Sequence, residues 1–80
     1  MSGRPVKRSL TLRGHRTSVS LEEEFWNAFR HIATARGRPI NALAAEIDAA
    51  RGMEIGLASA IRVYVLKEIQ KAVGQGHTAG

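Results

Sequence analysis

The segment from His15 to Ile47 constrains the fold most, because it places a single short strand directly before two helices. Residues 16–21 alternate polar and apolar side chains, as in a strand with one buried face. A strand needs a hydrogen-bonded neighbour, and even a two-stranded hairpin alone is only marginally stable in water. Since the rest of the chain offers little to pair with, we expect the same strand of a second copy as its partner. The predicted fold is therefore mostly α with one short strand, in an intertwined homodimer with an intermolecular antiparallel β-ribbon.

A second arrangement of the N-terminal region stays open. Residues 9–13 also alternate polar and apolar side chains, and Gly14 interrupts the pattern. Two strands separated by Gly14 and His15 could instead fold back as a hairpin within one chain. No internal repeat is recognised in the sequence.

Three helices are predicted after the strand, each with apolar side chains at helical spacing. They span about residues 22–36, 39–50 and 57–73. The last has apolar residues at every fourth position and others beside them, a pattern that implies burial on more than one side, across a dimer. The predicted dimer core consists of Val19, Leu21, Phe25, Trp26, Phe29, Ile32, Leu43, Ile47, Ile61 and Val65.

Eighty residues make one domain. We expect a flexible basic arm (1–8), a folded domain (9–73) and a disordered tail (74–80). So small a core needs further support, and the absence of cysteine excludes disulfides and thiolate zinc sites. The three scattered histidines do not form a metal-ligand spacing, so no metal or other cofactor is expected. Dimerisation remains the common route to stability.

The positive charge is concentrated at the N-terminus. The first 16 residues hold five basic residues and no acidic one, whereas residues 17–80 hold seven of each. This asymmetry suggests a polyanionic partner, nucleic acid first and an anionic membrane surface second. The alternative is a solvated basic tail that only aids solubility. No apolar run approaches the ~20 residues of a membrane span and no signal-peptide region is present, so a cytoplasmic protein without membrane contact is expected.

Three short motifs resemble the ribbon-helix-helix superfamily, the Arc/MetJ type of bacterial and phage DNA-binding proteins. They are the strand 17–21, the helix start 22–25 and the corner 37–41. GHRTSVSLEEEFW and LASAIRVYVL further resemble a small subfamily with an extra C-terminal helix, and the resemblance covers about residues 9–69. It implies a homodimer, with a tetramer on DNA left open, whose ribbon enters the major groove of double-stranded DNA.

The resemblance also implies the residues that contact bases. They are the outward residues of the strand, here Arg16, Ser18 and Ser20. A guanidinium can bond both acceptors of a guanine, although Arg16 could instead be an edge charge that discourages aggregation. The two serines could simply face solvent, and Ser20 with Glu23 also matches the capping-box spacing.

The resemblance also implies phosphate contacts at the start of the second helix, where backbone N–H groups are unpaired, and basic residues are expected to add further ones. The expected residues are Arg4, Lys7, Arg8, Arg13, His15, Arg38 and Asn41. Pro39 has no N–H, so Asn41 could cap that helix. In a second registration residues 56–61 match the start of the family's second helix, and Ser59 would then approach the phosphate.

The leading hypothesis is a sequence-specific DNA-binding homodimer, a small transcriptional regulator such as a repressor. The alternative is a protein-interaction module of the antitoxin or adaptor class, although the seven residues after Val73 are short for a neutralising segment. An enzyme is not expected, because no nucleophile–base–orienter set is visible. Glu22–Glu24 fit the positive end of a helix dipole, and Trp26 fits an apolar core better than a stacking platform for bases.

Overall fold

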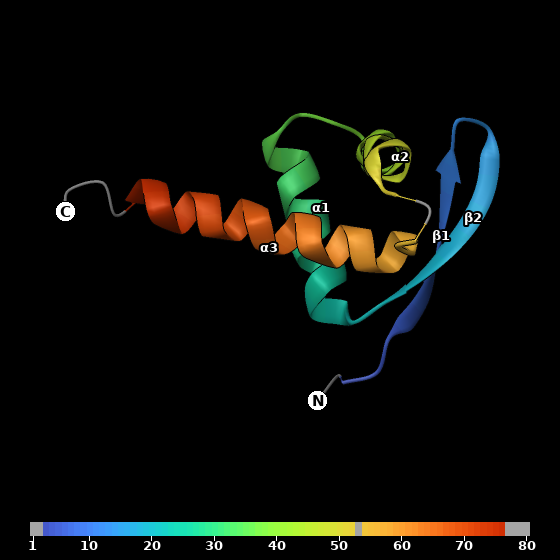
Figure 1. The fold of residues 1–80 in the computed structure, drawn as a ribbon, viewed down its shortest axis with the longest axis horizontal. Coiled ribbons are helices and arrows are strands. Elements are labelled where there is room, and N and C mark those ends of the chain that lie inside the picture. Colours follow the sequence, from blue (N-terminus) through green and yellow to red (C-terminus); the bar gives the residue numbers. More distant parts are fainter. Residues whose placement is uncertain (1–2, 53, 77–80) are drawn as a thin grey trace.

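A β-hairpin followed by three helices makes up the part of the chain that the computed structural model describes, residues 3–52 and 54–76. The elements in chain order are β1 (Val6–Leu12), β2 (His15–Leu21), α1 (Glu23–Ala35), α2 (Ile40–Ala50) and α3 (Leu57–Gly76). The hairpin lies along one side of the helices, α2 lies next to it, and α1 and α3 cross in contact (Figure 1). No helix in the described residues combines the length and apolar composition that a bilayer crossing requires.

The two strands pair antiparallel over their whole length, with Leu12 opposite His15 beside the loop. Arg13 and Gly14 form this two-residue loop, with φ angles of 52° and 84°. Positive φ at both positions is typical of a type I′ turn, whose twist matches that of the strands. Glycine adopts such angles freely, whereas at Arg13 the conformation costs energy.

The prediction of a single strand without a neighbour in its own chain is wrong. The hairpin alternative is confirmed, with Arg13 and Gly14 rather than Gly14 and His15 as its loop. The basic residues at positions 7 and 8 disguise this pairing, because they favour a solvated arm (1–8) and leave only residues 9–13 to oppose β2. In the structure residues 6–8 are the first residues of β1 and do not belong to a flexible arm. Residues 1 and 2 lie outside the described residues.

The two strands also repeat one pattern of side chains, so the expectation of no internal repeat is wrong. β1 reads VKRSLTL and β2 reads HRTSVSL, and both have the same order of exposed and buried residues. Each strand has a long cationic side chain at its second position, a serine at its fourth and a serine or threonine at its sixth. The repeat is hard to recognise because it is short and its residues are similar rather than identical.

The inner face of the hairpin and the helices share one hydrophobic core. Its buried residues are Leu10, Leu12, Val19, Leu21, Phe29, Ala33, Leu43, Ala44, Ile47, Ile61 and Val65. Of the residues predicted for a dimer core, Phe25, Trp26 and Ile32 are partly buried against this cluster, and the others lie inside it. One chain therefore buries by itself most of the side chains that the sequence pattern assigned to a dimer.

The first helix begins and ends by different means. Its N-cap residue is Glu22, without a capping side chain, so Ser20 belongs to β2 and does not cap the helix. At the other end Gly37 has a φ of 67°, its N–H donates to the carbonyl of Thr34, and the next N–H donates to that of Ala33. This is the Schellman arrangement, which a glycine permits.

The last helix is longer than predicted. Residues 74–76, expected in the disordered tail (74–80), continue α3, and residues 77–80 lie outside the described residues. A glycine lowers helix propensity by about 1 kcal/mol but keeps its backbone N–H. The glycines here therefore weaken the last turn without ending the helix.

The loop conformation predicts that Arg13→Asn stabilises the protein. Asparagine tolerates positive φ better than arginine, and Asn-Gly is a preferred type I′ pair. We expect the free energy of unfolding to rise by about 1 kcal/mol, measured by urea denaturation. Arg16→Asn is the control, because it removes the same charge from the hairpin without touching the loop. Equal stability of the two variants would contradict the observed turn.

Candidate nucleic-acid interface

The predicted base-contacting residues lie on one exposed face of β2. Arg16, Ser18 and Ser20 alternate with residues that point toward the core, so their side chains extend to the same side of the sheet. The structure therefore brings these three residues together on the side of the hairpin away from the helices.

β1 adds a second column to this face. Lys7, Ser9 and Thr11 are exposed and lie opposite Ser20, Ser18 and Arg16, respectively. We call these six residues the outer face of the hairpin. Sequence reasoning assigned Lys7 to phosphates and missed Ser9 and Thr11. The alternation of residues 9–13 was the available signal, and extending it back to residue 7 would have placed all three on one face.

The hairpin has an uncompensated positive charge. Residues 1–21 contain five basic residues and no carboxylate. The first carboxylate after them, Glu22, is engaged by Arg62 of α3, whose Nε donates to its Oε1 at 3.0 Å. The backbone N–H of Glu22 and this bond from Arg62 lower the pKa of the Glu22 carboxyl. Glu22 thus stays ionised but directed toward Arg62.

Arg62 also fixes the end of the hairpin. Its Nη2 donates to the carbonyl of Ser20 at 3.2 Å, and its guanidinium lies 5.8 Å from the centre of the Phe25 ring. One side chain of α3 therefore contacts both the end of β2 and the start of α1. This contact holds the outer face in a fixed orientation relative to the helices.

A groove at the tip of the hairpin gathers three of the predicted phosphate-contacting residues. Arg13, Arg38 and Asn41 line it together with Thr11, Pro39, Ala42, Ala45 and Glu46, and its volume is about 480 Å³. The first turn of α2 begins here, and the first N–H groups of a helix lack intrahelical partners. Asn41 does not cap α2, because its Oδ1 accepts the backbone N–H of Thr11 at 3.2 Å. Arg38 forms an ion pair with Glu46.

The other predicted phosphate-contacting residues are dispersed. Arg4 is exposed before β1, at the end of the hairpin away from the loop, and His15 is exposed beside the loop. Arg8 points to the inner side, where its guanidinium lies 5.2 Å from the Trp26 ring centre. Its Nε is buried without a hydrogen-bond partner in the described residues. Ser59, the alternative anchor, is exposed in the first turn of α3.

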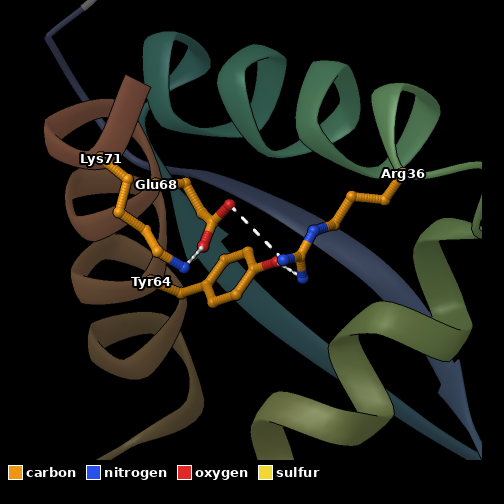
Figure 2. A network of polar contacts seen from close by, with 4 residues as sticks. All are labelled: Arg36, Tyr64, Glu68 and Lys71. Atoms are coloured by element: carbon orange, nitrogen blue, oxygen red, sulfur yellow. Dashed lines mark hydrogen bonds and ion pairs between the residues drawn. The ribbon is translucent and has the colours of Figure 1, made fainter. Parts of the chain in front are cut away.

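A polar network joins Arg36, the C-cap residue of α1, to α3 (Figure 2). Nη1 of Arg36 donates to the Tyr64 hydroxyl at 2.8 Å, and Nη2 of Arg36 lies 3.8 Å from Oε1 of Glu68. The other carboxylate oxygen of Glu68 pairs with Nζ of Lys71 at 3.3 Å. Burial raises the pKa of the Tyr64 phenol, and the charge of Arg36 opposes that rise. Tyr64 packs edge-on against Phe29, with 6.4 Å between ring centres. The network positions α3 on the core, and no group of three potential metal-ligating side chains occurs in the described residues.

The Glu22–Arg62 contact predicts an acid-dependent part of the stability. Because folding lowers the pKa of Glu22, its contribution is present above the unfolded value near 4.5 and is lost as the pH falls through the folded value. Glu22→Gln should therefore be less stable than the wild type at pH 7, and the difference should vanish in acid. Urea denaturation from pH 7 to pH 3 tests this expectation, with Glu54→Gln, an exposed carboxylate on the α2–α3 connection, as control. A difference independent of pH would contradict the contact.

Comparison with known proteins identifies the family. A family model described as a ribbon-helix-helix domain matches residues 5–69, which include both strands, α1, α2 and most of α3. No curated protein and no solved structure matched the chain. The matched segment spans most of the sequence and contains the hairpin and the tip groove described above. The chain therefore belongs to the ribbon-helix-helix domain family, in general a family of non-enzymatic DNA-binding folds.

Proposed function

We propose that this protein is a sequence-specific DNA-binding homodimer that acts as a small transcriptional regulator. The observation that carries the proposal is the outer face of the hairpin, an exposed two-stranded ribbon with long cations and hydroxyls and no carboxylate. The DNA major groove admits a two-stranded β-ribbon. Arg16 donates to guanine acceptors there, while the serine hydroxyls bond either donors or acceptors of neighbouring bases.

Phosphate binding supplies the remaining affinity. The tip groove offers the guanidinium of Arg13, that of Arg38 and the first N–H groups of α2, beside the ribbon rather than on it. Arg38 shares its charge with Glu46, so Arg13 is the stronger candidate for a phosphate contact. Arg4 binds a phosphate at the other end of the hairpin. Contacts at both ends orient the ribbon without reading sequence.

An exposed apolar stripe on α3 supports a homodimer. Val63, Leu66, Ile69 and Val73 are 50%, 52%, 47% and 62% exposed and lie on one side of the helix. Large apolar side chains left to water along a helix are typical of an interface. We propose the same stripe of a second copy as the partner, because this family generally binds DNA as dimers. The dimer then presents two hairpins to one duplex.

The DNA-binding proposal predicts different losses for two arginines. Arg16→Ala should relax the preference at one kind of base pair by about 1–3 kcal/mol, since a bidentate base contact is lost. Arg4→Ala should weaken binding to cognate and scrambled duplexes equally and reduce the slope of log K against log salt by about 0.9. Single substitutions are preferable to deletion of residues 1–8, which would remove the start of β1.

Fluorescence titrations at two salt concentrations measure these losses, with a cognate duplex selected from a random pool. Arg30→Ala, an exposed charge loss on α1, is the control. Equal loss on both duplexes for Arg16→Ala would reduce this residue to a phosphate contact. No binding of the wild type to any duplex at low salt would overturn the proposal and favour a protein-interaction module.

The dimer proposal predicts that Leu66→Glu produces monomers. A carboxylate in the middle of the apolar stripe opposes burial against a second copy, whereas the folded chain keeps its own core. Sedimentation should give a dimer for the wild type and for Asn27→Glu, an exposed change of equal charge on α1. The wild-type thermal midpoint should rise with protein concentration. A wild type that sediments as a folded monomer at micromolar concentration would exclude the dimer.

A further inference from the structure

The repeat between the two strands gives the outer face of the hairpin an approximate twofold symmetry. An antiparallel strand pair has a local twofold axis through the midpoint of two opposed residues, here Ser9 and Ser18. Rotation about this axis exchanges Lys7 with Arg16 and Thr11 with Ser20. Each position therefore receives a residue of the same chemistry: cation on cation, serine on serine, hydroxyl on hydroxyl. The inner face follows the same axis, because Leu12 is exchanged with Leu21.

From this symmetry we infer that one chain carries a complete reading ribbon with two equivalent sets of side chains. The first set is Lys7, Ser9 and Thr11, and the second is Arg16, Ser18 and Ser20. Resting on the DNA-binding proposal, the inference adds that each protomer contacts a short pseudo-palindromic element by itself. β1 then reads one half of that element and β2 reads the other, since operator symmetry mirrors the symmetry of the ribbon that reads it.

The loop geometry places the six side chains close together. A two-residue loop closes on a hydrogen-bonded pair, here Leu12 and His15, and such pairs alternate with non-hydrogen-bonded ones. Thr11 and Arg16 form the next, non-hydrogen-bonded pair, as do the other opposed pairs of the outer face. Opposed side chains are closest in these pairs. The two columns therefore form one narrow surface of the width that the major groove admits.

Contacts from the helices close both edges of the ribbon near its ends. In non-hydrogen-bonded pairs the backbone N–H and C=O groups point away from the partner strand. On the β1 edge the N–H of Thr11 donates to Asn41, and on the β2 edge the carbonyl of Ser20 accepts from Arg62. A third strand on either edge would have to displace one of these bonds. In the inferred arrangement the ribbon therefore stays two-stranded, and the second copy joins elsewhere.

Matched substitutions at symmetry-related positions test the inference. In selections from a random duplex pool, Lys7→Ala should lose discrimination at one side of the element and Arg16→Ala at the other. The expected loss at each position is roughly 5- to 150-fold, the equivalent of one bidentate contact. Lys7→Arg should make the two sides of the selected element more alike, because both cations are then guanidinium groups. Arg30→Ala should leave the element unchanged.

A ribbon made from two copies of β2 gives a different result. Arg16→Ala would then alter both symmetry-related positions, and Lys7→Ala would alter neither. Uniform weakening on all duplexes for Lys7→Ala would likewise overturn the inference while leaving the DNA-binding proposal intact. The DNA-binding proposal itself fails only if the wild type enriches no duplex in the same selection.

A cross-link tests the strand pairing without DNA. The chain has no cysteine, and Cα atoms in a non-hydrogen-bonded pair lie within disulfide range. Ser9→Cys with Ser18→Cys should therefore oxidise to a disulfide within one chain, seen as a monomer by mass on a non-reducing gel. Ser18→Cys alone should not form a covalent dimer. Rapid dimer formation by that single variant would show β2 pairing with β2 of another copy and would overturn the inference.

Discussion

The pairing of β1 with β2 through the Arg13–Gly14 loop determines the rest of the structure. Because side chains alternate along a strand, a slip of one strand by one residue would turn its buried side chains to solvent and its outer cation to the core. The two-residue loop fixes the register and so prevents this slip. With the register fixed, one face of the hairpin joins the helices and the other is exposed to solvent.

Apolar burial attaches the hairpin to the helices, and polar contacts orient it. Burying one leucine or valine contributes about 1.5–3 kcal/mol, and the inner face buries Leu10, Leu12, Val19 and Leu21. A hydrogen bond contributes about 1 kcal/mol net, so the bonds of Asn41 and Arg62 to the strands are minor terms in the attachment. They are directional, however, and they hold opposite edges of the ribbon. The outer face therefore has one orientation relative to α2 and α3.

The sequence predicted what depends on local pattern and missed what depends on distant partners. The bounds of α1 and α2 agree with the structure within one residue, because their apolar stripes end at glycine and proline, as at Gly37 and Pro39, whereas α3 continues past Gly74. The exposed face of β2 also follows from its alternation. β1 was not predicted in full, because Arg8 is a charged residue on the inner side, stabilised there by the Trp26 ring. The partner of Asn41 is the backbone of Thr11, 30 residues earlier, and no local pattern indicates such a contact.

The two-residue loop also allows the ribbon to form before two chains associate. A hairpin closes within one chain in about 1–10 μs and at a rate independent of concentration. A ribbon assembled from two chains must await their encounter, which at micromolar concentration and ordinary association rates takes about a second. A newly made chain can therefore present its outer face before it meets a second copy. In the proposed DNA-binding dimer, association of two chains then determines how many ribbons reach the duplex, while the shape of each ribbon is already set.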